Sequence, residues 1–456
     1  MGKTGWMVSN LKKTYRYLRR NGVRPAILAA AERLLQEREQ RGYTWQAPPK
    51  EELERQRREA AAWHEPPLFS IAVPAYETPP LYLKELLDSL QAQTWPYWEL
   101  VLADAGSGAG TEQAVRRRGD ERIRYHKLPC NGGIAENTNA ALREAKGDYI
   151  GLLDHDDVLT PDALYHMACA VRERERAGER AALLYSDEDK YEEGENGGAG
   201  RFYELHRKPD FDLDLLLSNN YICHFLVMEA GLIRELGERG GYDGAQDYDL
   251  VLRAAGRLMD EGREADILHV PRVLYHWRCH QASTAANPAS KSYAYEAGKR
   301  ALEDFCRERG WKAEVTHLRH LGYYRVSFQG DILAARPDLG AVAGPLPPVR
   351  GKLNSGIYDA VRCEGAGTPP VLSMRYCGLP SGFTGPFHRA ILPQEAEAAD
   401  IRTMRVRPEF QAELDQAVEA LRRGADPART SLEFCALIRR KGLRILWDPS
   451  RKEGAK

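Results

Sequence analysis

The 456-residue sequence lacks long apolar runs and has almost no net charge. No stretch approaches the roughly 20 apolar residues that a membrane-spanning helix needs. The basic N-terminus leads into an amphipathic segment rather than the apolar core of a secretion signal. Its 65 Lys and Arg residues nearly cancel 66 Asp and Glu residues, which argues against a general nucleic-acid binder. We therefore expect a cytoplasmic protein that does not bind nucleic acid.

Paired cysteines are also lacking. The eight cysteines are scattered along the chain, and no two have the spacing of a CxxC motif. Such a pattern indicates neither a zinc site nor a disulfide framework, and a reducing compartment agrees with it.

Residues 1–65 read as a basic, amphipathic helical arm. Seven Lys and Arg residues precede the first acid, Glu32; they are Lys3, Lys12, Lys13, Arg16, Arg19, Arg20 and Arg24. A basic amphipathic helix can lie on an anionic lipid surface, here the inner face of the cell membrane. The alternative, a solvated arm packed on the main domain, stays open.

Residues 66–330 show strand-length apolar runs that alternate with helical patterns. The runs are 69–73, 99–103, 122–127, 149–153 and 182–185, and the helical patterns cover 80–93, 110–118, 134–145 and 161–177. This alternation predicts an α/β domain with a mostly parallel sheet and helices on both faces. Ligands of such sheets bind beyond the carboxyl ends of the strands.

Polar clusters follow the predicted strands at that edge. They are Pro74-Ala75-Tyr76-Glu77, Asp104-Ala105-Gly106-Ser107, Asn131-Gly132-Gly133 and Asp154-His155-Asp156-Asp157. The first three also have ordinary explanations as turns or caps. The fourth places three aspartates within four residues after a buried strand, and a divalent cation commonly compensates such charge. Oxygen ligands favour Mg²⁺ or Mn²⁺ over zinc.

Two further clusters lie downstream. Asp247 opens a helical pattern, where it is either a functional carboxylate or an ordinary N-cap. An extended segment ends at His276-Trp277-Arg278. A lone histidine in such a place is more often structural than a metal ligand.

Taken in order and spacing, these segments resemble the family-2 glycosyltransferases over about Leu68–Ser283. The resemblance rests on Ser70–Tyr76, Asn131–Ile134, Leu152–Asp157, Tyr185–Lys190, Asn220–His224, Gln246–Leu250 and His276–Arg278. It is nearest to the branch that assembles cell-surface polysaccharides, including rhamnan and O-antigen transferases. The resemblance implies a GT-A fold and an inverting transfer of sugar from a nucleotide-diphosphate donor.

The resemblance also implies roles for matching residues. The nucleotide-sugar would contact Pro74, Tyr76, Glu77, Asp104, Asn131, Gly133, Asn137, Asp154 and His155. Asp154 and Asp156 would form the DxD pair for Mn²⁺ or Mg²⁺, with His276 as a further metal ligand. Asp247 would be the catalytic base, although Gln246 stands where the family usually has Glu. The donor would be dTDP-rhamnose or a UDP-hexose, and the acceptor a lipid-linked or growing glycan.

Two other functions compete with this interpretation. A nucleotidyltransferase would carry a basic, glycine-rich loop after the first strand, but no Lys or Arg follows Pro74 before Lys84. An inactive glycan-binding or scaffolding protein on a transferase fold is the second alternative. The presence of Asp154, Asp156, Asp247 and His276 argues against it.

Residues 331–456 form a C-terminal extension behind the Pro- and Gly-rich stretch Ala335–Pro348. We expect a buried strand at Leu339–Gly344. The helical pattern Ser431–Arg440 leading to Leu443–Trp447 mirrors Asp247–Arg253 leading to Ile267–Trp277. This suggests the acceptor half of a second transferase domain, with Ser431 in the position of Asp247. An unrelated small α/β appendage is the alternative.

Overall fold

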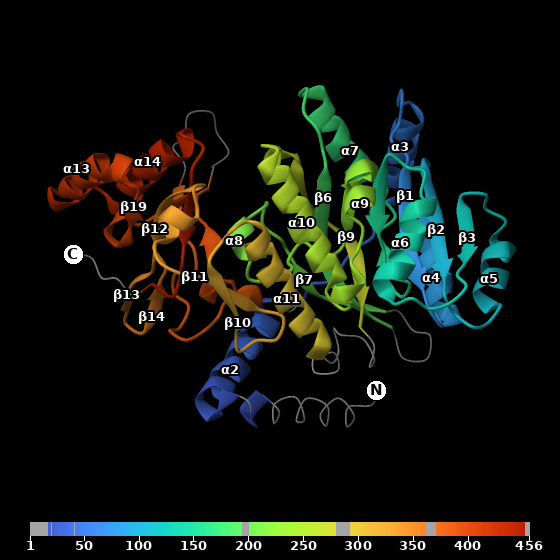
Figure 1. Cartoon of the computed structure of the whole chain (residues 1–456), viewed down its shortest axis with the longest axis horizontal. Coiled ribbons are helices and arrows are strands. Elements are labelled where there is room, and N and C mark those ends of the chain that lie inside the picture. The colour runs from blue at the N-terminus through green and yellow to red at the C-terminus, as the bar shows by residue number, and fades with distance from the viewer. Residues whose placement is uncertain are drawn as a thin grey trace. The chain divides into compact units, whose positions relative to one another are not determined.

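The computed structural model describes residues 17–19, 21–40, 42–193, 200–279, 292–361 and 371–451. The chain packs as two compact units (Figure 1). The sheet unit comprises Gln40–Phe211 and Asn220–Phe305, and the tail unit comprises the residues up to Glu39, Asp212–Asn219 and those from Cys306 onward. The packing units therefore do not follow the predicted boundaries at residues 65 and 330.

The described part of the sheet unit contains a nine-stranded sheet with the order β3-β2-β1-β4-β8-β6-β9-β5, and β7 beside β6. Its first half is parallel, as predicted: β1 pairs with β2 and β4, and β2 pairs with β3. The second half is mixed, because β8 runs antiparallel to β4 and β6, while β6 and β9 are parallel. The strands are β1 (Phe69–Ala75), β2 (Trp98–Asp104), β3 (Ile123–Lys127), β4 (Tyr149–Leu152), β5 (Val158–Leu159), β6 (Leu183–Glu192), β7 (Arg201–His206), β8 (Leu226–Glu229) and β9 (Ile267–Arg278).

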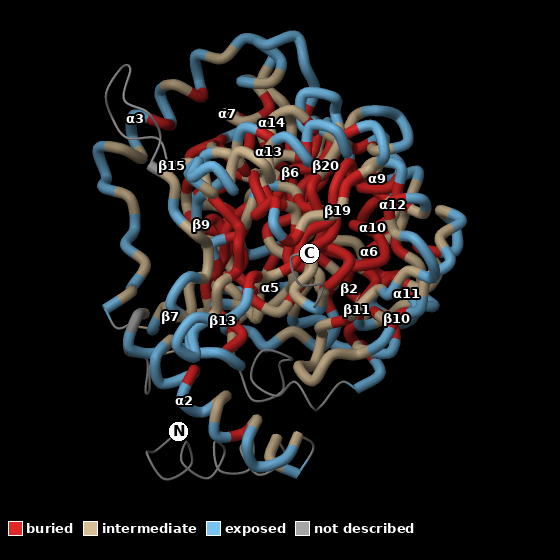
Figure 2. Tube along the Cα trace, turned by 90° about the vertical axis from the view of Figure 1, so that its left-hand side faces the viewer, coloured by how far each residue is buried: buried red, intermediate tan, exposed pale blue. Residues whose placement is uncertain are grey.

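Helices cover this sheet, so its central strands are buried on both faces. All seven residues of β2 are buried, and only Pro74 of β1 is partly exposed. Strands covered on both faces consist almost entirely of apolar residues. The apolar runs of the sequence therefore predicted their positions. The helices are α4 (Pro80–Gln91), α5 (Gly110–Arg118), α6 (Ile134–Glu144), α7 (Ala163–Arg176), α9 (Ala230–Leu236), α10 (Gln246–Asp260) and α11 (Ser292–Glu308). Figure 2 shows the burial concentrated in the strands, with α2 and α3 largely exposed.

The predicted arm is divided between the two units. Helix α2 (Val23–Glu39) belongs to the tail unit, whereas the segment from Gln40 through α3 (Lys50–Ala61) belongs to the sheet unit. There Thr94 Oγ1 donates to buried Gln56 Oε1 at 2.8 Å. Of the seven basic residues that motivated a lipid-surface helix, only Arg19 and Arg24 lie within the described residues. No helix in the described ranges is long and apolar enough to cross a bilayer.

The C-terminal extension contains the predicted buried strand, β12 (Leu339–Ala343), in the tail unit. It pairs in parallel with β20 (Arg444–Trp447) in a sheet of order β17-β20-β12-β19. The remaining elements are β10 (Ala313–His317), β11 (Tyr324–Phe328), β13 (Leu346–Val349), β14 (Lys352–Asn354), β15 (Ile357–Val361), β16 (Val371–Met374), β17 (Gln394–Glu395), β18 (Ala398–Ala399), β19 (Arg405–Val406), α8 (Leu213–Leu216), α12 (Ile332–Ala335), α13 (Gln411–Arg422) and α14 (Pro427–Arg440). Ser431 on α14 is buried, and its hydroxyl accepts from the Ile401 backbone N–H at 3.3 Å. Whether this extension descends from a second transferase half stays a hypothesis.

Candidate active site

The ends of β1 and β2 are joined by side-chain to backbone hydrogen bonds. Glu77 Oε1 accepts from the Ser107 backbone N–H at 2.8 Å, and this bond lowers the pKa of the Glu77 carboxyl. Asp104 is buried, with Oδ1 accepting from Gly106 N–H and Oδ2 accepting from the Tyr125 hydroxyl, each at 2.8 Å. Asp104 thus shapes its own turn, while the neighbouring Tyr76 side chain is half exposed at 51%. At the end of β1, Tyr76 is thus open to solvent and Pro74 is partly exposed.

The predicted Asn131 loop is a closed polar network. Asn131 Oδ1 accepts from Asn137 Nδ2 at 2.9 Å and from Gly133 N–H at 3.1 Å. Gly133 has a φ of 96°, and a Cβ there would lie 2.4 Å from Asp243 Oδ2. Only glycine meets both demands without strain. Asp243, which the sequence reasoning missed, also accepts from Ala135 N–H at 3.3 Å.

The acidic turn follows β4. Ligand atoms of Asp154, Asp157 and His224 all lie within 4.8 Å of one another. Asp157 is buried and accepts from the Tyr275 hydroxyl and, at 2.6 Å, from the Arg278 backbone N–H. His155 Nδ1 lies 2.8 Å from Thr78 Oγ1. This donor set of two carboxylates and an imidazole is able to hold Mn²⁺ or Mg²⁺.

Crowding of like charges perturbs this turn. Burial and the charges of Asp156 and Asp154 raise the pKa of Asp157 well above its usual range. Burial also raises the pKa of Asp154, with Asp156 and Asp247 adding to the effect and His224 opposing it. A divalent cation would relieve this repulsion, so the residues present fit the cation that the sequence predicted.

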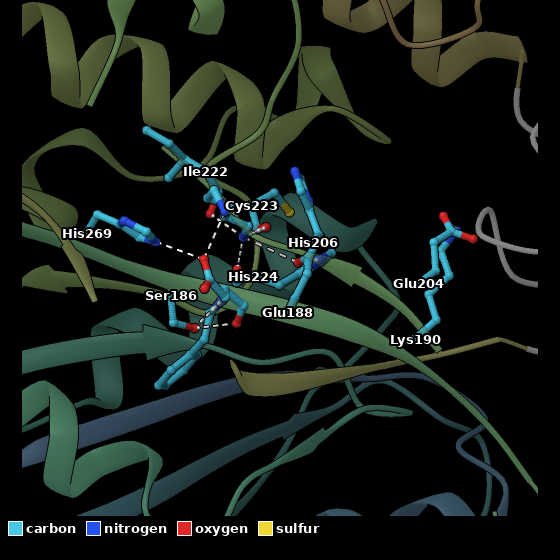
Figure 3. Close-up of polar contacts among 12 residues, drawn as sticks. Ser186, Glu188, Lys190, Glu204, His206, Ile222, Cys223, His224 and His269 are labelled. Atoms are coloured by element: carbon cyan, nitrogen blue, oxygen red, sulfur yellow. Dashed lines mark hydrogen bonds and ion pairs between the residues drawn. The ribbon is translucent and has the colours of Figure 1, made fainter. Parts of the chain in front are cut away.

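Strand β6 supplies three consecutive acids, and each contacts a histidine. Asp187 Oδ1 lies 2.8 Å from His269 Nε2, and Asp189 Oδ1 lies 2.5 Å from His276 Nδ1. Between them, Glu188 contacts His206 Nδ1 at 3.1 Å and His224 Nδ1 at 3.2 Å (Figure 3). The Tyr185–Lys190 segment belongs to the resemblance, but the sequence assigned these acids no role.

A buried lysine holds the loop that carries His224. Lys208 Nζ donates to the carbonyls of Ile222 at 3.3 Å and Cys223 at 2.6 Å, and to that of His224. Its ammonium also lies 3.4 Å from Glu188 Oε2. Burial lowers the pKa of His224, but its hydrogen bond to Glu188 and the surrounding carboxylates outweigh this and raise the pKa to about 9.

The predicted ligands Asp156 and His276 are not members of the gathered group. In the sheet His276 pairs with Val158, two residues beyond Asp156, so its backbone lies beside the turn. Its ring contacts Trp45 and Phe202, with centroid distances of 4.6 and 4.4 Å. His276 Nε2 is buried and has no hydrogen-bond partner among the described residues. Metal binding by Asp156 and His276 stays a prediction.

Asp247 is not the N-cap of its helix, so that interpretation is wrong. Helix α10 begins at Gln246 and is preceded by Ala245, and no side chain caps it. Asp247 Oδ2 instead accepts from Asn220 Nδ2 at 2.9 Å. Nearby Glu238 is buried, and burial followed by the charge of Asp247 raises the pKa of its carboxyl well above the usual range. Asn220, which lies 27 residues before Asp247, was missed as its neighbour because only the fold brings the two together.

Comparison with known proteins adds to this geometry. The family model for glycosyl transferase family 2 matches residues 70–237. The uncharacterized glycosyltransferase RT0329 of Rickettsia typhi is 34% identical over 240 residues, which are 51% of this chain and 70% of that protein.

Other relatives are much longer than the matched region. O-antigen biosynthesis protein RfbC of Myxococcus xanthus is 35% identical over 56% of this chain but 19% of its own length. Uncharacterized protein y4gI of Sinorhizobium fredii is 42% identical over 52% of this chain and 25% of its own length. The chain therefore spans a quarter or less of these two relatives. Among solved structures, mannosyltransferase PcManGT from Pyrobaculum calidifontis, in complex with GDP-Man and Mn²⁺, is 18% identical with a TM-score of 0.38, over 62% of this chain and 83% of that chain.

Proposed function

The chain belongs to glycosyl transferase family 2, and we propose that it transfers a sugar with inversion from a nucleotide-diphosphate donor to a glycan acceptor. The observation that carries this proposal is the position of Asp247. It is not a cap, it accepts from Asn220, and its charge acts on Asp154 of the acidic turn. A base and a cation-binding turn thus lie in one unit.

The donor is bound by the ends of β1 and β2 and by the Asn131 loop. In this proposal Pro74, Tyr76, Glu77 and Asp104 face the base and ribose, and Asn131, Gly133, Asn137 and His155 complete the site. The hydrogen bond between Glu77 and Ser107 and the network of Asn131 hold these segments in place before the donor arrives. The donor is dTDP-rhamnose or a UDP-hexose.

The leaving diphosphate is handled at the acidic turn. Mn²⁺ or Mg²⁺, when bound there, supplies positive charge to the departing nucleotide. Asp154 and Asp156 would hold it as the DxD pair, with His276 as a further ligand. Asp157 contributes to the fold of the turn as well, since its oxygens accept from Tyr275 and from the Arg278 backbone.

Asp247 takes the proton of the attacking hydroxyl. A sugar hydroxyl has a pKa far above 7, so a positioned base assists its attack. Asn220 fixes the orientation of the carboxylate through one oxygen. A single displacement inverts the anomeric carbon, and no second carboxylate nucleophile is needed.

The acceptor is a lipid-linked or growing glycan of a cell-surface polysaccharide. The name of RfbC, an O-antigen biosynthesis protein, supports this class. Contact with the membrane surface through the basic residues before Arg41 is part of the proposal, although most of them lie outside the described residues. The C-terminal extension supports or positions this single active centre.

A donor panel tests the function. The full-length protein is incubated with Mn²⁺, each sugar nucleotide and a lipid-diphosphate acceptor, and products are read by mass spectrometry. We expect turnover of one donor, and loss of that turnover in Asp247→Asn. Glycan binding without turnover of any donor would favour the inactive glycan-binding alternative.

A further inference from the structure

We propose that the segment ahead of β1 completes the cation site by holding the ring of His276 in a fixed orientation. The positioning residues are Tyr43 and Trp45 of this segment and Asp189 of β6. The inference rests on the proposed role of His276 as a ligand of the cation. It goes beyond that role, because Tyr43 and Trp45 precede the match to the family model, which begins at residue 70.

Strand pairing brings His276 and Asp189 together. His276 of β9 lies opposite Asp189 of β6 in the parallel register, and opposite Val158 of β5 on its other side. Val158 is two residues beyond Asp156, so the sheet itself sets His276 beside the acidic turn. Both side chains are buried, with 3% of His276 and 0% of Asp189 exposed. A contact between them is therefore fixed by the sheet and sheltered from water.

The two ring nitrogens of His276 have different surroundings. Nδ1 lies 2.5 Å from Asp189 Oδ1, whereas Nε2 is buried and has no hydrogen-bond partner among the described residues. Metal-binding histidines commonly donate one ring N–H to a carboxylate, which fixes the tautomer and leaves the other nitrogen to the metal. With Nδ1–H donated to Asp189, the lone pair of Nε2 is available to a cation. Buried polar atoms without a partner are rare, and a cation accounts for this one.

Tyr43 engages the second oxygen of the same carboxylate. Its hydroxyl donates to Asp189 Oδ2 at 2.8 Å, so one oxygen of Asp189 is bound by Tyr43 and the other by His276. A buried carboxylate is costly unless hydrogen bonds satisfy it. The carboxylate cannot turn without losing one of these two bonds. Tyr43 therefore fixes the orientation of the His276 ring through Asp189.

Trp45 covers the ring of His276. Its indole meets the imidazole edge-on with 4.6 Å between ring centroids, and Phe202 of β7 packs on the same imidazole at 4.4 Å. Trp45 and Phe202 also contact each other, with centroids 5.3 Å apart. The hydrophobic surroundings of a metal site control the access of water to it. Trp45 thus keeps water from the imidazole, which favours a cation as the partner of Nε2.

His269 provides a matched control on the same pair of strands. It also lies on β9 and contacts an acid of β6, with Nε2 2.8 Å from Asp187 Oδ1. Its other nitrogen is occupied as well, because Nδ1 lies 3.3 Å from Asp210 Oδ1. No nitrogen of His269 is left for a metal. Pairing with an acid of β6 therefore does not by itself make a histidine a ligand, and the free Nε2 distinguishes His276.

The experiment is Mn²⁺ binding to the full-length protein, followed by electron paramagnetic resonance. The free Mn²⁺ signal gives the affinity, and electron spin echo modulation by nitrogen reports a bound imidazole. We expect modulation in the wild type and its loss in His276→Gln. Tyr43→Phe removes only a hydroxyl and Asp189→Asn only a charge, and each should bind Mn²⁺ about 10- to 100-fold more weakly, as outer-shell changes do. Trp45→Leu should also bind more weakly.

Two variants serve as controls. Thr44→Ala alters an exposed residue between the two positioning residues of the segment, and His269→Gln removes the histidine whose nitrogens are both occupied. Each should keep the affinity and the nitrogen modulation of the wild type. A merely structural role of Tyr43 would lower the melting temperature of Tyr43→Phe but leave the affinity of the folded protein unchanged.

Three results would overturn the inference: no nitrogen modulation in the wild type, modulation that survives in His276→Gln, or wild-type affinity in Tyr43→Phe. Circular dichroism establishes that each variant is folded, and if Asp189→Asn is not, Tyr43→Phe decides. Turnover of a sugar nucleotide with and without Mn²⁺ is measured in parallel. When turnover depends on Mn²⁺ but Tyr43→Phe binds it normally, this inference fails and the proposed function stands.

Discussion

At the scale of single residues, the acids of the sheet unit differ in what they contact, and each contact makes a different prediction. Asp247 sits in the first turn of α10 without capping it. Its Oδ2 accepts from Asn220, and its charge acts on Asp154 and Glu238. The carboxylate is thus held by groups of the site rather than by the helix.

Replacing Asp247 by Asn should therefore separate activity from stability. The amide has the same shape but cannot accept a proton, so we expect kcat to fall by about 10²- to 10⁴-fold, the usual contribution of a general base. The melting temperature should stay close to that of the wild type, because no cap is lost. Both quantities are measured on one sample, and a normal kcat would rule out Asp247 as the base.

Asp156 and the cation can be tested together. A chelator should abolish turnover, and added Mn²⁺ or Mg²⁺ should restore it. Asp156→Ala should lose at least about a hundredfold in kcat, the scale of removing one preorganised charge stabiliser. Steady-state rates with and without EDTA check this, and full activity in the chelator would contradict a metal role.

His269 gives a prediction about pH. Burial lowers its pKa, but hydrogen bonds to Asp187 and Asp210 outweigh this and raise the pKa above the ordinary value. A raised histidine pKa stabilises the fold fully below the unfolded value of about 6.5, and this contribution is lost as the pH rises through the folded value.

His269→Gln should accordingly lower the free energy of unfolding by about 1.5–3 kcal/mol in mild acid, the range for a hydrogen bond to a charged group. The difference from wild type should shrink as the pH rises above the folded pKa. Urea denaturation at pH 5.5 and at pH 9 measures it. The His269 ring also stacks on Tyr185, with ring centroids 5.1 Å apart. An equal difference at both pH values would show that this packing, rather than charge, is responsible.

At the scale of elements, the strands that the sequence located best are those buried on both faces. β1, β2 and β4 appear as continuous apolar runs, and their polar ends are where the sequence placed them. The sequence ended the next strand at Tyr185, whereas β6 continues to Glu192. The predicted strand ended at Tyr185 because the residues that follow it in β6, Ser186 to Lys190, are polar or charged.

The acids in β6 are tolerated because their partners come from elsewhere in the chain. His269 and His276 lie on β9, His206 on β7, and Lys208 just beyond β7. The periodicity of one segment gives no information about its contacts with residues from other parts of the chain. The same limitation hid His224 and Asn220, which reach the site only through the fold, whereas the spacing of Asp154, Asp156 and Asp247 was visible in sequence.

At the scale of the whole molecule, a short stretch of chain passes from the sheet unit into the tail unit and back. Asp212–Asn219, which contains α8, packs with residues after Cys306. Its Asp214 forms a fully buried ion pair with Arg336, with 2.8 Å between Oδ1 and Nη1. Arg336 also contacts Asp338 at 2.6 Å.

Breaking this buried pair should destabilise the tail unit. Arg336→Met leaves Asp214 buried without its main partner, and we expect a loss of about 3–5 kcal/mol. Replacing both residues, as in Asp214→Leu with Arg336→Met, should recover part of that loss, because Asp214 is no longer left as an unpaired buried carboxylate, while the neighbouring acids Asp212 and Glu395 remain. Guanidinium denaturation of the two variants checks this; a double variant no more stable than the single one would contradict it.

The segment between α2 and β1 bears on where a working fragment of this protein must begin. Tyr43 donates to Asp189 at 2.8 Å, Trp45 lies against His276, and Gln56 accepts from Thr94. The match to the family model begins at residue 70. A gene fusion with its junction at residue 70 would remove Trp45 from the His276 ring and Tyr43 from Asp189. The segment needed for activity is therefore expected to include residues 40–69, which precede the match to the family model. Chimaeras with related proteins should retain activity only when the junction lies before residue 40.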